Sequence, residues 1–197
     1  MGSSLSKVQV QEYIEQSGGL FTGDEIRYMH KMFHKAAPGG KMGHAEFKRY
    51  IDGLGIFPKV EAVEEFRHLF RGYDHNGDED ISFIEFLQYH ATVMFDTDKE
   101  MAFDIIFQMY NKQTTEKTRL GQDFITKEDI VEVITDSTRW MGKYDVALRQ
   151  VQEMIEGEAT KLMASCDLRK TGRITKEDLH TACNADPDIF QKLKAYA

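Results

Sequence analysis

In one short segment of the sequence, side chains with oxygen atoms recur at every second position from residue 74 to residue 82, and another follows at residue 85. A hard cation such as Ca²⁺ takes six to eight oxygen ligands, and a 12-residue loop supplies them from positions 1, 3, 5, 7, 9 and 12. The residues at these positions are Asp74, Asn76, Asp78, Asp80, Ser82 and Glu85. Asp80 contributes its backbone carbonyl, and Ser82 a hydroxyl or a bound water. The spacing therefore predicts one Ca²⁺ site, with Mg²⁺ as the alternative ion at rest.

The sixth position of this loop departs from the usual pattern. Glycine is expected there, because the backbone turns sharply with a positive φ, but the sequence has Glu79. A residue with a Cβ atom in that conformation costs about 1–2 kcal/mol. This corresponds to roughly a five- to thirtyfold loss of affinity. Five carboxylates repel one another in the loop until a cation binds. We therefore expect binding, at reduced affinity.

Apolar residues recur every three to four positions on both sides of the loop, along residues 60–70 and 86–93. This periodicity predicts a helix, a loop and a second helix. The same unit occurs four times, each with an apolar residue at loop position 8 and an acid at position 12. The four pairs are Met42 with Glu46, Ile81 with Glu85, Ile125 with Asp129, and Ile174 with Asp178.

An even number of units allows neighbouring loops to pair through their position-8 residues. We expect short two-stranded bridges between Met42 and Ile81 and between Ile125 and Ile174. The predicted fold is all-α, with four helix-loop-helix units in two lobes, residues 1–97 and 98–197. The boundary is placed where polar residues interrupt the apolar pattern, around residues 95–99.

The other three loops have lost side chains that bind a cation. Loop 35–46 retains only Glu46 as a side-chain oxygen ligand. Loop 167–178 has Arg169 among its ligand positions and the short Asp178 at position 12, which reaches a metal poorly. An insertion around residues 113–120 breaks the register of the third loop. We expect all three loops to act as scaffolds without metal.

Composition excludes several classes of function. The formal net charge of −8 disfavours nucleic acid as a partner, because binding to phosphates needs a basic face. No run of about 20 apolar residues is present to span a membrane. The two cysteines form no CxxC motif, and no secretory signal is recognised, so an intracellular, cytoplasmic location is expected. Motifs for catalysis are missing, and we predict that the chain is not an enzyme.

The amino terminus reads Met-Gly-Ser-Ser-Leu-Ser, which matches M-G-x-x-x-[ST]. Gly2 would accept a myristoyl group. Vector-derived starts also begin Met-Gly-Ser-Ser, but no run of histidines follows here. A single myristoyl chain gives marginal, reversible membrane attachment. We therefore expect peripheral contact with the inner face of a membrane.

These features together resemble the neuronal calcium sensor family of EF-hand proteins. The resemblance covers essentially the whole chain and includes Pro38 and Gly40 in the first loop, although Ala37 stands where that family has a cysteine. Within the family, residues 47–57 look most like the guanylate cyclase-activating and guanylate cyclase-inhibitory proteins. The resemblance implies a calcium sensor that binds a helix of a target protein, with a membrane guanylate cyclase as the suggested target.

Two other functions compete with this interpretation. Three silent loops and Glu79 also fit a calcium-independent EF-hand adaptor or regulatory subunit, which would bind its target with or without calcium. A simple calcium buffer is disfavoured, because one weak site in 197 residues has little capacity.

Overall fold

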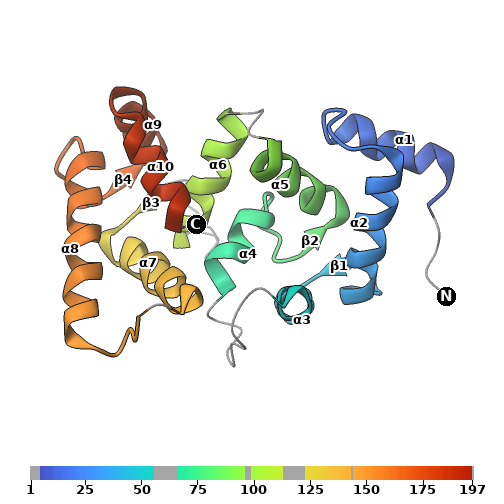
Figure 1. The fold of residues 1–197 in the computed structure, drawn as a ribbon. Helices are drawn as coiled ribbons and strands as arrows, with labels where there is room; N and C mark the ends of the chain where they lie inside the picture. The colour runs from blue at the N-terminus through green and yellow to red at the C-terminus, as the bar shows by residue number, and fades with distance from the viewer. Residues whose placement is uncertain (1–4, 56–65, 96–98, 113–122, 143, 197) are drawn as a thin grey trace. The chain divides into compact units, whose positions relative to one another are not determined.

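The computed structural model describes residues 5–55, 66–95, 99–112, 123–142 and 144–196 of the chain. In these ranges the secondary structure consists of ten helices and two pairs of two-residue strands (Figure 1). The predicted all-α fold is confirmed. Among the described helices, none combines the length and the apolar character needed to cross a membrane.

The first five helices and two strands flank the first two loops, and a sixth helix follows them. In chain order they are α1 (Lys7–Gln16), α2 (Gly23–Ala36), β1 (Lys41–Met42), α3 (His44–Leu54), α4 (Arg67–Tyr73), β2 (Ile81–Ser82), α5 (Phe83–Phe95) and α6 (Lys99–Tyr110). The helix predicted over residues 60–70 is described only from Phe66 onward, because residues 56–65 lie outside the described ranges.

The remaining elements surround the last two loops. They are β3 (Phe124–Ile125), α7 (Lys127–Met141), α8 (Arg149–Cys166), β4 (Ile174–Thr175), α9 (Lys176–Ala185) and α10 (Pro187–Tyr196). The hydroxyl of Tyr110 donates a hydrogen bond to the carbonyl of Leu193 at 3.1 Å, and so holds the end of α10 against the end of α6.

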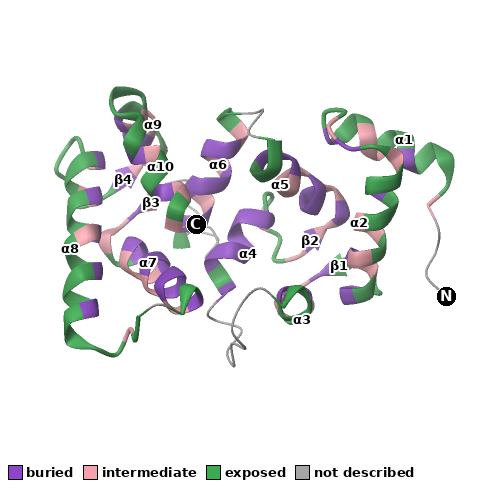
Figure 2. Cartoon of the chain, in the orientation of Figure 1, coloured by how far each residue is buried: buried purple, intermediate pink, exposed green. Residues whose placement is uncertain are grey.

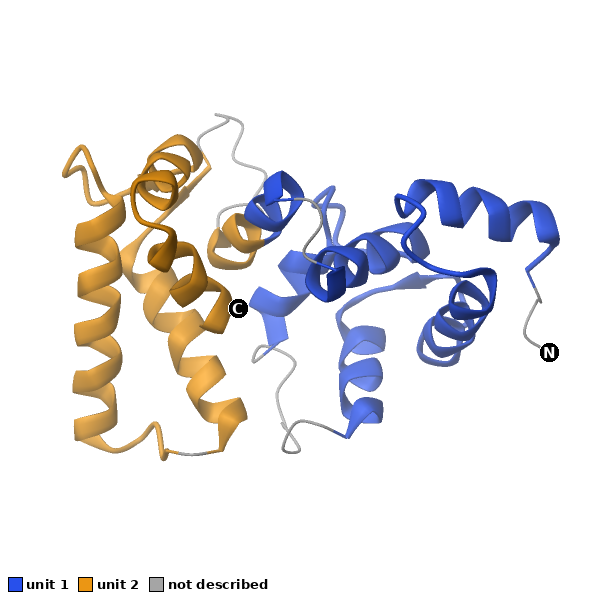
Figure 3. Cartoon of the chain, turned by 45° about the horizontal axis from the view of Figure 1, so that its top comes forward, with its two compact units in different colours: residues 1–105 blue, residues 106–197 orange. Residues whose placement is uncertain are grey.

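Two compact units make up the chain, residues 1–105 and 106–197, and they meet within α6 (Figure 3). The boundary predicted after residue 97 lies in residues 96–98, outside the described ranges, and stays a prediction. Each unit has its own set of buried residues (Figure 2). Phe33, Phe70 and Phe86 are among the buried side chains of the first unit, and Ile130 and Leu179 are among those of the second.

The loops pair as the sequence predicted. Strand β1 is antiparallel to β2 with Met42 opposite Ile81, and β3 is antiparallel to β4 with Ile125 opposite Ile174. The exposed fraction of all four side chains is 1% or less. The position-8 residues therefore form the backbone bridge and also occupy the core of each unit.

Shortening the side chain of Ile81 tests the structural importance of this bridge. Ile81→Ala removes buried methyl groups beside Met42, and we expect the free energy of unfolding to fall by about 2–5 kcal/mol. Val93→Ala, on a side chain that is 47% exposed, is the matched control and is expected to change stability by only about 0.5 kcal/mol. Equal losses in chemical denaturation of the two variants would contradict this account of the core.

Candidate functional site

The backbone of the loop between α4 and α5 turns where the predicted calcium site requires it. Gly77 has a φ of 70° and Glu79 a φ of 66°. The sequence-based expectation of a positive φ at Glu79 is therefore confirmed. A Cβ atom in this left-handed region is strained, which is why glycine is preferred there.

Asp74 organises the first half of the loop. Its Oδ1 atom accepts the N–H groups of Gly77 and Asp78 at 3.0 and 3.2 Å, and its Oδ2 atom accepts the N–H of Glu79 at 3.0 Å. One carboxylate therefore holds three successive amides of the turn.

Glu85 closes the loop from the first turn of α5. Its Oε1 atom accepts the N–H of Asn76 at 3.2 Å, nine residues earlier in the chain. Its Oε2 atom accepts the N–H and the hydroxyl of Ser82 at 2.9 and 2.6 Å. Like Asp74, Glu85 is buried, with 6% of its surface exposed. The structure therefore brings two of the predicted ligands to the inside of the loop.

Negative charge is concentrated around Asp74. Burial is the main cause of a raised pKa at this carboxyl group; the N–H of Glu79 opposes the shift, and the charges of Glu85 and Asp78 add to it. A raised pKa means that the ionised form is disfavoured in the absence of a cation. A cation placed in the loop would relieve this repulsion.

Asp78 and Asp80 have a cationic neighbour from another loop. The Nζ atom of Lys41, on β1, lies 3.3 Å from Oδ2 of Asp78 and 3.5 Å from Oδ2 of Asp80. Burial alone would raise the pKa of Asp78, but the N–H of Asp80 and the ammonium group of Lys41 outweigh it, and the pKa is lowered. These two carboxylates are thus partly neutralised by the protein itself.

The residue types and the backbone turn of this loop fit Ca²⁺, but the side chains are not yet grouped around a common centre. Within the described ranges, no three histidine, cysteine or acidic side chains are grouped so that they could hold a metal ion. Asp74 and Glu85 accept N–H groups of the loop, while Asp78 contacts Lys41. Ion binding therefore requires some of these side chains to move toward a common centre.

The fourth loop is closed by its own guanidinium group. Arg169, at position 3, donates to Oδ2 of Asp178 at 2.8 Å and to the hydroxyl of Thr175 at 3.0 Å. Burial works to raise the pKa of Asp178, but its bonds with Thr175 and Arg169 keep the pKa below its usual value. A positive charge thus already contacts the acid that would bind a metal.

The first and third loops also differ from the second. Glu46 of the first loop pairs with Arg49 at 2.7 Å on α3, and Gly43 provides no side-chain cap for this helix. In the third loop, Asp129 accepts the N–H of Thr126 at 2.8 Å. The insertion predicted at residues 113–120 lies outside the described ranges.

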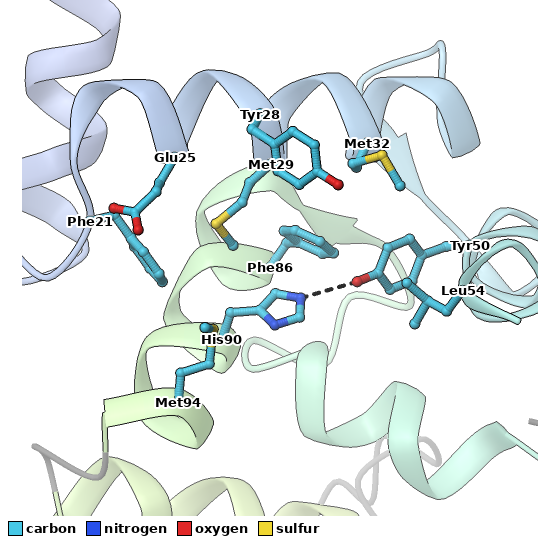
Figure 4. A pocket seen from close by; sticks show the side chains of 10 residues that line it. All are labelled: Phe21, Glu25, Tyr28, Met29, Met32, Tyr50, Leu54, Phe86, His90 and Met94. Atoms are coloured by element: carbon cyan, nitrogen blue, oxygen red, sulfur yellow. Dashed lines mark hydrogen bonds between the residues drawn. The ribbon is translucent and has the colours of Figure 1, made fainter. Parts of the chain in front are cut away.

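An apolar cavity of about 280 Å³ lies in the first unit, bordered by α2, α3 and α5 (Figure 4). It is lined by Phe21, Glu25, Tyr28, Met29, Met32, Tyr50, Leu54, Phe86, His90 and Met94. We did not predict this cavity from the sequence, because methionine and aromatic residues at helical spacing are also typical of a filled core. Only the packing of α2, α3 and α5 shows that these residues line a cavity and do not fill a core.

His90 is a half-buried polar residue of the cavity wall. Its Nε2 atom lies 3.2 Å from the hydroxyl of Tyr50 (Figure 4). The same atom lies 3.4 Å from the hydroxyl of Tyr73. Burial lowers the pKa of His90 to about 4, so the ring is neutral at physiological pH. The charged residue of the lining is Glu25, which caps its own helix by accepting the N–H of Thr22.

Four acid-ended loops, joined in two antiparallel bridges and flanked by helices, form the EF-hand fold. No protein-family model matches the chain. Over 194 residues, 98% of this chain and 96% of the relative, it is 26% identical to neuronal calcium sensor 1 of Lymnaea stagnalis. It is 27% identical over 110 residues to guanylyl cyclase-activating protein 2 of Lithobates pipiens, covering 56% and 50% of the two chains.

A third relative is visinin of Gallus gallus, with 25% identity over 138 residues, covering 68% of this chain and 66% of the relative. Together these relatives confirm the resemblance to neuronal calcium sensors. They also bear out the prediction that the chain is not an enzyme, because the first two are named as a calcium sensor and an activating protein. Gly2 lies in residues 1–4, outside the described ranges, so its acylation stays a prediction.

Replacing Glu79 tests the strain at position 6. Glu79→Gly removes a Cβ atom from a backbone with a φ of 66°, and we expect calcium to bind about five- to thirtyfold more tightly by calorimetry. Glu79→Gln is the control for the lost charge, because it keeps the Cβ atom. Affinity of the glycine variant equal to or below that of the glutamine variant would contradict the assigned strain.

Proposed function

We propose that this protein is a calcium sensor that binds one Ca²⁺ in the loop from Asp74 to Glu85. The observation that supports it best is the arrangement of this loop. Two buried carboxylates, Asp74 and Glu85, face its interior, and the backbone turns with positive φ at Glu79. In the proposed site, Asp74, Asn76, Asp78 and Glu85 bind through side chains and Asp80 through its carbonyl oxygen, with Mg²⁺ as the alternative ion at rest.

Helix α5 provides the route from the loop to the apolar cavity. Glu85 lies in its first turn, while Phe86, His90 and Met94 of the same helix line the cavity. If Glu85 turns to bind the ion, α5 shifts against α2 and α3 and the cavity changes shape. Helix reorientation of this kind is how EF-hand sensors expose apolar surface.

A helix of a target protein is the proposed occupant of the opened cavity. Its walls carry Met29, Met32 and Met94, and methionine adapts well to varied apolar partners. An amphipathic helix places such anchors at positions i, i+3, i+4 and i+7. The relative named guanylyl cyclase-activating protein 2 supports a membrane guanylate cyclase as the target.

Attachment to the inner face of a membrane through a myristoyl group on Gly2 completes the proposal. Ser6, the hydroxyl residue of the acylation motif, caps α1 by accepting the N–H of Gln9 at 3.2 Å. The motif therefore ends where the first helix begins, and Gly2 precedes that helix by only a few residues. Mass spectrometry of the protein purified from a eukaryotic host tests acylation directly.

Calcium titration tests the proposed site. We expect one bound Ca²⁺ per chain by calorimetry, and loss of that binding in Glu85→Gln, because the variant loses the bidentate carboxylate at position 12. Glu46→Gln is the matched control, since it changes the same position of the silent first loop and should leave binding unchanged. Absence of heat with the wild-type protein, or full binding by Glu85→Gln, would refute the proposal.

The contact between Arg169 and Asp178 favours a second candidate, a calcium-independent adaptor. This pair closes the fourth loop without any metal, so the second unit needs no calcium to hold its loops together. We expect a sensor to recover its target from a membrane extract in calcium and to lose it in chelator. Equal recovery under the two conditions would favour the adaptor and reject the sensor.

A further inference from the structure

Lys41 belongs to the silent first loop, but its ammonium group lies in the second. It occupies position 7 of loop 35–46, on β1, directly opposite Ser82 of β2. This register carries its side chain toward the acidic turn, where Nζ lies 3.3 Å from Asp78 and 3.5 Å from Asp80. The antiparallel bridge therefore places the ammonium group of Lys41, from the first loop, beside predicted ligands of the second loop.

The contact competes with an ion for the same carboxylate. Oδ2 of Asp78 accepts from Lys41, and Oδ1 of Asp78 accepts the N–H of Asp80 at 3.1 Å. Both oxygens of this position-5 residue are therefore engaged. An ion that binds Asp78 meets both partners at the same carboxylate, and Lys41 is the partner that also repels a cation.

We propose that Lys41 is an internal competitor of calcium, which stabilises the ion-free loop and lowers its affinity. This inference rests on the proposed calcium site. It assigns the first loop a role although that loop has lost its own ligands. Through Lys41 on β1, the first loop lowers the calcium affinity of the second loop. The side chain of Lys41 is 55% exposed and that of Asp78 is 43% exposed, so water and salt screen the interaction and its effect is moderate.

Removing the charge should tighten calcium binding. For Lys41→Met we expect affinity to rise about two- to fivefold at low ionic strength, the range that a single exposed ion pair provides. The gain should shrink near 1 M salt, where charges are screened within about 3 Å. Lys41→Arg keeps the charge and should retain the affinity of the wild-type protein.

Lys48→Met is the matched control. Lys48 belongs to the same unit and loses the same charge, but its partner is Asp52 at 2.7 Å on α3, not the calcium loop. We expect its calcium affinity to stay near that of the wild-type protein. Calorimetry on the four full-length proteins, with calcium alone as the titrant, measures all of these affinities.

The outcomes separate the two proposals. If the wild-type protein binds no calcium, the proposed site fails, and this inference fails with it. If the wild-type protein binds calcium but Lys41→Met binds no more tightly than Lys48→Met, the site stands and the role of Lys41 is wrong. Tightening by Lys41→Met that Lys41→Arg does not share, and that shrinks at high salt, would establish the competition.

Discussion

The hydrogen bond between the acid at loop position 12 and the hydroxyl residue at position 9 is the interaction on which three of the four loops depend. Glu85 with Ser82, Asp129 with Thr126, and Asp178 with Thr175 each join a loop to the helix that follows it. Reciprocal bonds of this kind also cap the helix. Because the acid starts the helix, its position is decided by folding, whether or not a metal binds.

The loops differ in what neutralises that acid. Asp178 pairs with Arg169 of its own loop, and Glu46 pairs with Arg49 of the following helix. Within the described ranges Glu85 forms no ion pair with an arginine or lysine, and the neighbouring Asp74 has a raised pKa. The second loop therefore keeps negative charge that no arginine of its own offsets, whereas in the first and fourth loops an arginine pairs with the acid. Lys41 offsets part of this charge from a neighbouring loop.

Much of the fold follows from local patterns. The repeated apolar residue at position 8 and acid at position 12 predicted four loops and both bridges, because the position-8 residue is buried in every copy and the acid begins the next helix. The positive φ at Glu79 followed from its place in the loop. The cavity did not follow, since Met29 and Phe86 have the same spacing whether they fill a core or line a space. The contacts of Lys41 were also missed, because they join residues 37 and 39 positions apart.

The sequence by itself determined the helix-loop-helix units, the pairing of the loops and the residue types offered to a cation. These depend on periodicity and short-range spacing, which can be read directly from the sequence. Tertiary structure alone decided where charges meet and where apolar surface stays open. The register of β1 on β2 brings Lys41 to Asp78, and the packing of α2, α3 and α5 leaves a cavity beside His90. Such contacts arise between segments distant in sequence, and their geometry depends on how whole helices pack.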